Sequence, residues 1–173
     1  MPSQNFQNHF DLLGLPARFA LDGALLESRY RELQSQVHPD RFAAGSDAER
    51  RVAMQWATRA NEAYRTLRDP VGRARYLLAL KGFDTGEESN TAMPADFLMQ
   101  QMEWRESVAE ASAAHDAAAL AGLRREIDGA RAEMLQMLGR AIDQDANFDA
   151  GCSLVRKLRF LEKLEEEIEE ALG

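Results

Sequence analysis

The sequence predicts an all-α protein built from two groups of helices. Apolar residues recur at spacings of three and four along several long stretches, which is the pattern of amphipathic helices. No stretch shows a convincing strand alternation or the turn signal of a hairpin. A segment rich in turn-forming residues, over 82–95, separates the two groups. We therefore expect one domain over residues 1–81, and a linker with a second domain over residues 82–173.

The first domain is predicted to begin with a brief helix. An apolar stretch that contains Phe10 is broken by Gly14 and Pro16, which indicates a loop. The next helix begins after Asp22, whose side chain can cap its N-terminus, and runs to about Val37. Its apolar stripe consists of Leu26, Tyr30, Leu33 and Val37.

The tripeptide His38-Pro39-Asp40 follows this helix. A residue before a proline is biased away from helical dihedral angles, so the helix should end near Val37. Pro39 fixes its own φ and has no backbone N–H to donate. We therefore expect a polar, partly stiffened loop that projects a histidine and an aspartate from the tip of a helical hairpin.

The second helix of the hairpin carries a specific start signal. Ser46 and Glu49 have the spacing of a capping box, in which each side chain bonds the backbone N–H of the other residue. The apolar stripe of this helix is Val52, Trp56, Ala60, Ala63 and Leu67. The pair Asp69-Pro70 should end it and begin another helix, for which Gly82 is the expected C-terminal cap.

Three longer helical patterns follow the linker. The first spans about Pro94 to His115, Asp116 can cap the second, and the third occupies the C-terminal part. Their apolar stripes are Phe97, Gln101, Trp104, Val108 and Ala111 in the first, Leu120, Leu123, Ile127, Met134, Leu138 and Ala141 in the second, and Leu154, Leu158, Leu161, Ile168 and Leu172 in the third. Three long amphipathic helices with short connections predict an antiparallel three-helix bundle.

The composition limits which ligands and which cellular compartment we expect for this protein. The net charge of −8 argues against nucleic acid, and its division into +3 over residues 1–82 and −11 over 83–173 hints at two halves with different partners. No stretch approaches the ~20 apolar residues of a membrane span. The opening five residues lack the features of a secretory signal, so we expect a cytoplasmic protein that binds no membrane. Since Cys152 is the single cysteine, we expect no disulfide, no metal site and no cofactor.

The first helix of the predicted bundle has an unusual outer face. At ~100° per residue, Leu98, Met99 and Met102 fall roughly opposite the core stripe, where a surface helix should be polar. The same face also carries three glutamates, which are Glu103, Glu106 and Glu110. The alternative is a wide apolar band packed on two neighbours, but a deeply buried band would not tolerate these carboxylates. A small apolar patch rimmed by carboxylates indicates a protein-binding surface.

The helix pair with its HPD loop resembles the J-domain, which stimulates ATP hydrolysis by chaperones of the DnaK/HscA class. The resemblance implies that His38, Pro39 and Asp40 dock on the partner ATPase, where the aspartate pairs with an arginine. Basic residues beside the loop would contribute, and here they are Arg29, Arg31 and Arg41. Because Glu27 and Glu32 offset the first two, electrostatic steering should be modest. The alternative is a polar loop in which Asp40 only turns or caps the backbone.

Further segments resemble the HscB family, the J-type co-chaperones of iron–sulfur cluster assembly. They are Phe10-Asp11-Leu12-Leu13-Gly14-Leu15-Pro16, the HPDRF loop, Arg75-Tyr76-Leu77-Leu78, Gly82-Phe83-Asp84, Phe97-Leu98-Met99 and Val155-Arg156-Lys157-Leu158-Arg159-Phe160-Leu161. The resemblance implies an L-shaped protein whose C-terminal bundle binds the IscU-type scaffold. The implied scaffold-binding positions are Leu98, Met99, Met102, Glu103, Glu106, Glu110 and Phe160. Phe160 lies at the edge of its own stripe and could belong to the core or to the contact.

The expected function is that of a co-chaperone and not of an enzyme. It would stimulate the ATPase of an HscA/DnaK-class chaperone and deliver the IscU-type scaffold to it during iron–sulfur protein maturation. One alternative is a J-domain protein that delivers a different client. A second is an enzyme that uses His38 and Asp40 as an acid–base pair, and a third is a helical adaptor without ATPase-stimulating activity.

Overall fold

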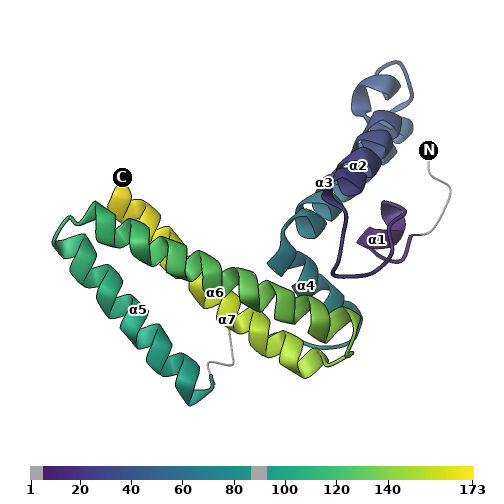
Figure 1. The fold of residues 1–173 in the computed structure, drawn as a ribbon. Helices are drawn as coiled ribbons and strands as arrows, with labels where there is room; N and C mark the ends of the chain where they lie inside the picture. The colour runs from purple at the N-terminus through teal and green to yellow at the C-terminus, as the bar shows by residue number, and fades with distance from the viewer. Residues whose placement is uncertain (1–5, 87–92) are drawn as a thin grey trace. The chain divides into compact units, whose positions relative to one another are not determined.

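The computed structural model describes residues 6–86 and 93–173 and is helical throughout its regular structure, with no strand in those residues (Figure 1). The predicted all-α class is confirmed. The opening five residues and residues 87–92 of the expected linker lie outside the described residues. The chain divides into two compact units, Met1–Leu77 and Leu78–Gly173. The division after Leu77 and the boundary expected after residue 81 both lie near the C-terminal end of one helix, Pro70–Leu80. The expected domain bounds stay a prediction.

The N-terminal unit is a helical hairpin with two short additions. It contains α1 (His9–Leu12), α2 (Gly23–Val37), the 3₁₀ turn η1 (Pro39–Phe42), α3 (Asp47–Arg68) and most of α4 (Pro70–Leu80). The helices α2 and α3 pack side by side, and α1 packs on α3 (Figure 1). η1 forms the turn of the hairpin, so the tripeptide lies at its tip as expected.

Capping bonds begin these helices, and a proline ends one of them, where the sequence indicated. The carboxylate of Asp22 accepts hydrogen bonds from the first backbone N–H groups of α2. Ser46 and Glu49 form the complete capping box at the start of α3, with Ser46 N–H donating to Glu49 Oε2 over 2.8 Å. α3 ends at Arg68 and α4 begins at Pro70, as the Asp-Pro pair predicts.

The core of the hairpin differs from the predicted stripe on α3. The seam is Ala53, Ala60, Ala63 and Leu67, all at most 1% exposed. Val52 is 39% exposed, so its placement in the core was wrong. Trp56 is only half-buried, and its ring is covered by the edge of Phe6 and by the Arg59 guanidinium. The small alanine side chains allow α2 to approach closely, and this tertiary contact sets the phase of the buried face.

Aromatic and polar contacts hold α2 against α3 at the rim of this core. The rings of Tyr30 and Tyr64 stack with their centroids 4.2 Å apart. The Tyr30 hydroxyl donates to Asn61 Oδ1 over 2.7 Å, and the Tyr64 hydroxyl donates to Glu27 Oε2 over 3.0 Å. Tyr30 is half-buried because its hydroxyl needs a polar partner near the surface.

A histidine holds α1 against α4. The His9 imidazole stacks on the Tyr76 ring at 4.4 Å, and the His9 backbone N–H donates to the Tyr76 hydroxyl over 2.9 Å. Partial burial lowers the pKa of His9, Glu62 opposes this shift, and Arg59 adds to it. The neutral imidazole is therefore the form that the folded unit favours.

The C-terminal unit is the predicted three-helix bundle. α5 (Ala95–Ala113), α6 (Ala117–Asp143) and α7 (Phe148–Leu172) each pack on the other two (Figure 1). One core cluster joins them and consists of Phe97, Trp104, Val108, Ala111, Leu120, Ile127, Phe160, Leu161, Leu164 and Ile168. Asp116 caps α6 as expected, since its carboxylate accepts from Ala119 N–H.

The chain that leaves α4 is tied to the first half of α7. The Phe83 and Phe148 rings lie 5.3 Å apart, and Arg156 Nη1 donates to the Thr85 carbonyl over 2.8 Å. Thr85 is only 6% exposed. The start of the predicted linker is thus part of the packed C-terminal unit.

A core substitution in α7 should weaken the bundle. Leu161 is fully buried between the three helices, so Leu161→Ala should lower the free energy of unfolding by about 3 kcal/mol through lost transfer energy and the remaining cavity. Urea unfolding followed by circular dichroism checks this value. Leu172→Ala is the matched control, because Leu172 is 42% exposed and should change stability little. Equal effects of the two variants would contradict the described core.

The histidine on α1 should make the N-terminal unit sensitive to acid. Because the folded pKa of His9 is lowered, the unfolded chain binds more protons, and stability falls as the pH falls through the ordinary range of histidine. The urea midpoint should therefore drop between about pH 7.5 and about pH 5.5. His9→Phe keeps a ring for the stack on Tyr76 and removes the titration, so its midpoint should drop less. An identical drop in both proteins would show that His9 is not responsible.

Candidate functional site

Pro39 shapes the turn at the tip of the N-terminal unit. His38 has φ −58° and ψ 129°, the extended conformation that a residue before proline prefers, and α2 ends there. Residues Pro39–Phe42 form a single 3₁₀ turn instead of an open loop, with Pro39 at its first position. The Arg41 N–H donates to the His38 carbonyl over 3.1 Å. The expected stiffened loop is therefore a hydrogen-bonded turn.

The histidine caps this turn and leaves the aspartate in water. His38 Nδ1 accepts from the Asp40 N–H over 3.3 Å, and the same nitrogen lies 3.5 Å from Asp40 Oδ2. Accepting the N–H bond requires an unprotonated Nδ1, so we assign the ring proton to Nε2 and regard the carboxylate contact as secondary. The Asp40 side chain is 91% exposed. The turn thus presents one carboxylate and one imidazole N–H outward.

Two arginines stabilise the turn by donating to backbone carbonyls on either side of it. Arg41 Nη1 donates to the Ser35 carbonyl over 2.9 Å, which satisfies a backbone group in the last turn of α2. Arg50 Nη1 donates to the Ala43 carbonyl over 3.1 Å, and its Nη2 pairs with Asp47. Sequence reasoning treated Arg41 only as a docking cation and missed Arg50. Arginines near helix ends often bond free carbonyls, a signal that favours the role of Arg41 but does not identify Arg50.

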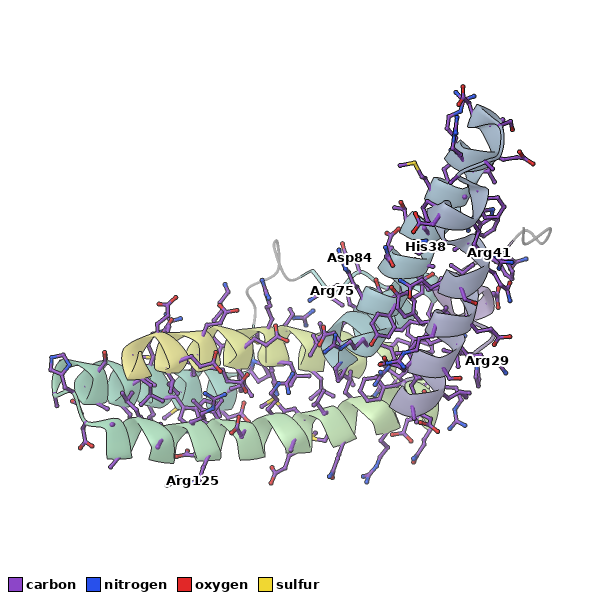
Figure 2. All side chains as sticks on the ribbon, turned by 90° about the horizontal axis from the view of Figure 1, so that it is seen from above. Arg29, His38, Arg41, Arg75, Asp84 and Arg125 are labelled. Carbon is purple, nitrogen blue, oxygen red and sulfur yellow. The ribbon has the colours of Figure 1, made fainter. Side chains whose placement is uncertain are left out.

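The cations on α2 are paired within the helix, as Glu27 and Glu32 led us to expect. Arg31 lies 2.7 Å from Glu27, and Arg29 lies 3.6 Å from Glu32. The hydrogen bond from Tyr64 and then the bonds from Arg31 hold the pKa of Glu27 below its usual range, so this carboxylate stays ionised. Arg29, His38 and Arg41 all come from the α2–η1 segment (Figure 2). The exposed charge near the turn is therefore nearly balanced.

The outer face of α5 carries the second candidate site. Leu98 is 41% exposed, Met99 is 65% exposed and Met102 is 72% exposed. Glu103, Glu106 and Glu110 are exposed on the same helix. The predicted exposure of this face is confirmed, and the alternative of a band buried between two neighbours is wrong. We call Leu98, Met99, Met102 and the three glutamates the α5 patch.

The inner face of α5 explains why the patch points outward. Phe97, Trp104, Val108 and Ala111 are each at most 7% exposed in the bundle core. The indole Nε1–H of Trp104 donates to Glu126 Oε1 on α6 over 2.8 Å, which satisfies the one polar group that this large ring buries. With α5 held in this rotation, residues on its opposite side remain in solvent.

Phe160 lies in the core and not in the exposed patch. It is 8% exposed, and its ring meets the Phe97 ring edge-on at 6.1 Å. The Arg105 guanidinium lies 5.4 Å from the centre of the Phe160 ring. Of the two possibilities left open from the sequence, the structure supports packing. The Phe160 side chain packs on Phe97 of α5, so it supports the helix that carries the patch.

The structure also describes the surroundings of the titratable side chains at the two candidate sites and elsewhere. In the residues that the structure describes, no group of three or more His, Cys, Asp and Glu side chains could hold a metal ion. His38 and Asp40 lie at an exposed tip, where water would screen any acid–base pair. Cys152 is buried, and burial raises the pKa of its thiol.

Within residues 6–86 and 93–173, no helix has the length and apolar character to cross a bilayer.

Comparison with known proteins finds relatives over almost the whole chain. Residues 93–169 match the family model described as the HSCB C-terminal oligomerisation domain. The co-chaperone protein HscB homolog of Burkholderia multivorans is 56% identical over 161 residues, which cover 93% of this chain and 91% of the relative.

Solved structures of HscB proteins also match this chain over most of its length. The chaperone HscB from Vibrio cholerae has 39% identity and a TM-score of 0.83, with 95% of this chain and 96% of the other covered. The human co-chaperone protein HscB has 31% identity and a TM-score of 0.90, with 96% of this chain and 83% of the other covered. With this identity over nearly its full length, the chain belongs to the HscB family of J-type co-chaperones.

Proposed function

We propose that this protein stimulates the ATPase of an HscA/DnaK-class chaperone and delivers an IscU-type scaffold to it during iron–sulfur protein maturation. The observation that carries the proposal is that two exposed features of distinctive chemistry lie in separate compact units. One is the HPD turn of the N-terminal unit, and the other is the α5 patch of the C-terminal unit. Membership of the HscB family supports both roles.

The HPD turn is the proposed contact with the ATPase. The exposed Asp40 carboxylate can pair with an arginine of the partner, and the His38 Nε2–H can donate a second bond. Such contacts promote hydrolysis only if they are stronger in the hydrolysis-competent state of the chaperone. We assign Arg41 a positioning role as well, because its guanidinium already holds the end of α2. Arg29 and Arg31 contribute little steering, since each is paired on its own helix.

The α5 patch is the proposed contact with the scaffold. Leu98, Met99 and Met102 supply apolar area, and the surrounding glutamates favour a partner surface with cations at matching positions. Phe160 takes part by supporting α5 from the core through Phe97. Holding both sites in one chain raises the effective concentration of the scaffold at the chaperone. In this proposal the protein works in the cytoplasm, holds no cofactor and catalyses no reaction itself.

A substitution in the HPD turn should abolish ATPase stimulation. His38→Gln removes the ring that caps the turn and donates from Nε2, so single-turnover ATP hydrolysis by an HscA-type chaperone should lose more than about tenfold of its stimulation. His115→Gln makes the same change at an exposed histidine between α5 and α6 and should stimulate like the wild type. Full stimulation by His38→Gln would remove the HPD turn from the mechanism and favour a simple adaptor.

Truncation of the α5 patch should abolish scaffold binding. The triple variant L98A/M99A/M102A removes the exposed apolar area and leaves the core face of α5 intact, so the Kd for an IscU-type scaffold should rise at least about 100-fold. Isothermal titration calorimetry measures this value. The matched control L25A/V52A/M54A truncates three exposed apolar residues of the N-terminal unit and should bind normally. Unchanged binding by the patch variant would indicate a different client or a different surface.

A further inference from the structure

We propose that Met99 and Met102 form an oxidation site, and that conversion of their thioethers to sulfoxides by a peroxide stops scaffold binding at the α5 patch. The inference rests on the scaffold-binding function proposed above. It adds a modification site and a means of regulation to that surface.

Both thioethers are open to a small oxidant. Met102 and Met99 are 72% and 65% exposed, the highest values among the large apolar side chains that the structure describes. They are three residues apart on α5, so their side chains are neighbours on one helix face. Susceptibility of methionine to oxidation follows exposure, which makes these two the leading targets on the C-terminal unit.

The reaction needs only the thioether and the peroxide. A sulfur lone pair attacks one peroxide oxygen, the O–O bond breaks, and a sulfur–oxygen bond forms. The sulfur loses two electrons. The second oxygen of hydrogen peroxide takes up the proton from the transferred oxygen and leaves as water. The product is a polar, chiral side chain in place of a flexible apolar one.

A sulfoxide oxygen at this surface should lower the affinity of the α5 patch for the scaffold. Glu103 lies one turn beyond Met99, and Glu106 lies one turn beyond Met102, so two neighbours of the new oxygen are themselves hydrogen-bond acceptors. The donor nearest in sequence to Met102 on this side is Arg105, which lies outside the α5 patch and has its guanidinium over the Phe160 ring. On binding, the sulfoxide would have to leave water without gaining a donor from the patch. Two adjacent sulfoxides should therefore weaken scaffold binding by at least about tenfold.

Oxidation at these positions should leave the fold intact. The core face of α5 is formed by other residues, among them Trp104 and Val108, which are buried. Met93 and Met134 are half-buried against the core and should react more slowly. Cys152 is a poor competitor because it is buried, and its raised pKa keeps it as the less reactive thiol.

The chain provides its own matched control. Met54 on α3 and Met137 on α6 are 59% and 57% exposed and lie outside the patch. The pair M54L/M137L therefore removes two oxidisable thioethers of similar exposure, and M99L/M102L removes those of the patch. Each protein is compared with its own untreated sample, so the measured quantity is the ratio of its Kd after and before oxidation.

The test treats the full-length protein alone with hydrogen peroxide, removes the peroxide, and then measures binding to an untreated IscU-type scaffold by calorimetry. Peptide mass spectrometry records the sulfoxide at each methionine, and circular dichroism records the fold. Wild type and M54L/M137L should lose at least about tenfold in affinity, while the ratio for M99L/M102L stays near one. Treatment of the oxidised wild type with methionine sulfoxide reductases should restore binding.

The possible failures are distinguishable. A ratio near one for wild type with sulfoxide at both positions would overturn the switch. An equal loss in M99L/M102L would place the sensitive group elsewhere and overturn it as well. Peptide maps in which Met99 and Met102 resist peroxide while Met93 and Met134 react would overturn the site itself, whether or not a scaffold is bound. Absence of binding by untreated wild type would instead contradict the proposed function.

Discussion

The N-terminal site depends on one covalent constraint, the ring of Pro39. The ring disfavours helical geometry at His38, so α2 stops at the tip of the hairpin and its last carbonyls need other donors. Arg41 supplies one of these donors, and the histidine then caps the next turn with its own ring. The exposed aspartate is the product of this sequence of constraints, since its backbone N–H is used and its carboxylate is left in water.

The C-terminal site depends on a different constraint, the rotation of one helix. α5 contacts both α6 and α7, and the bond from Trp104 to Glu126 joins it to α6 at a defined orientation. A helix packed in this way hides one face and shows the other. The apolar residues that remain outside are then conspicuous, because core packing gives no reason for them to be apolar. This contrast is the physical basis for the recognition role proposed for the α5 patch.

The sequence predicted the features that arise from local bonds. Helix ends at Asp22, Ser46 and Pro70 were correct because capping and proline geometry act within a few residues. The α5 patch was found because interleaved glutamates mark an outer face without reference to any neighbour. Val52 was misplaced because the buried face of α3 follows the approach of α2, which no local pattern encodes. The burial of Phe160 depends on a contact between distant segments, and for the same reason it required the structure. Arg50 bonds groups only three and seven residues away, but no spacing rule identifies the Ala43 carbonyl as its acceptor.

The division of α5 into two faces has an evolutionary consequence. Its buried face is constrained by packing, whereas Leu98, Met99 and Met102 make few demands on the fold. Under the proposed function, mutations on the outer face can therefore be selected for their effect on the scaffold without a large penalty in stability. In this proposal the co-chaperone can change together with its scaffold by small steps, one exposed side chain at a time. The helix retains its place in the bundle while its outer surface diverges.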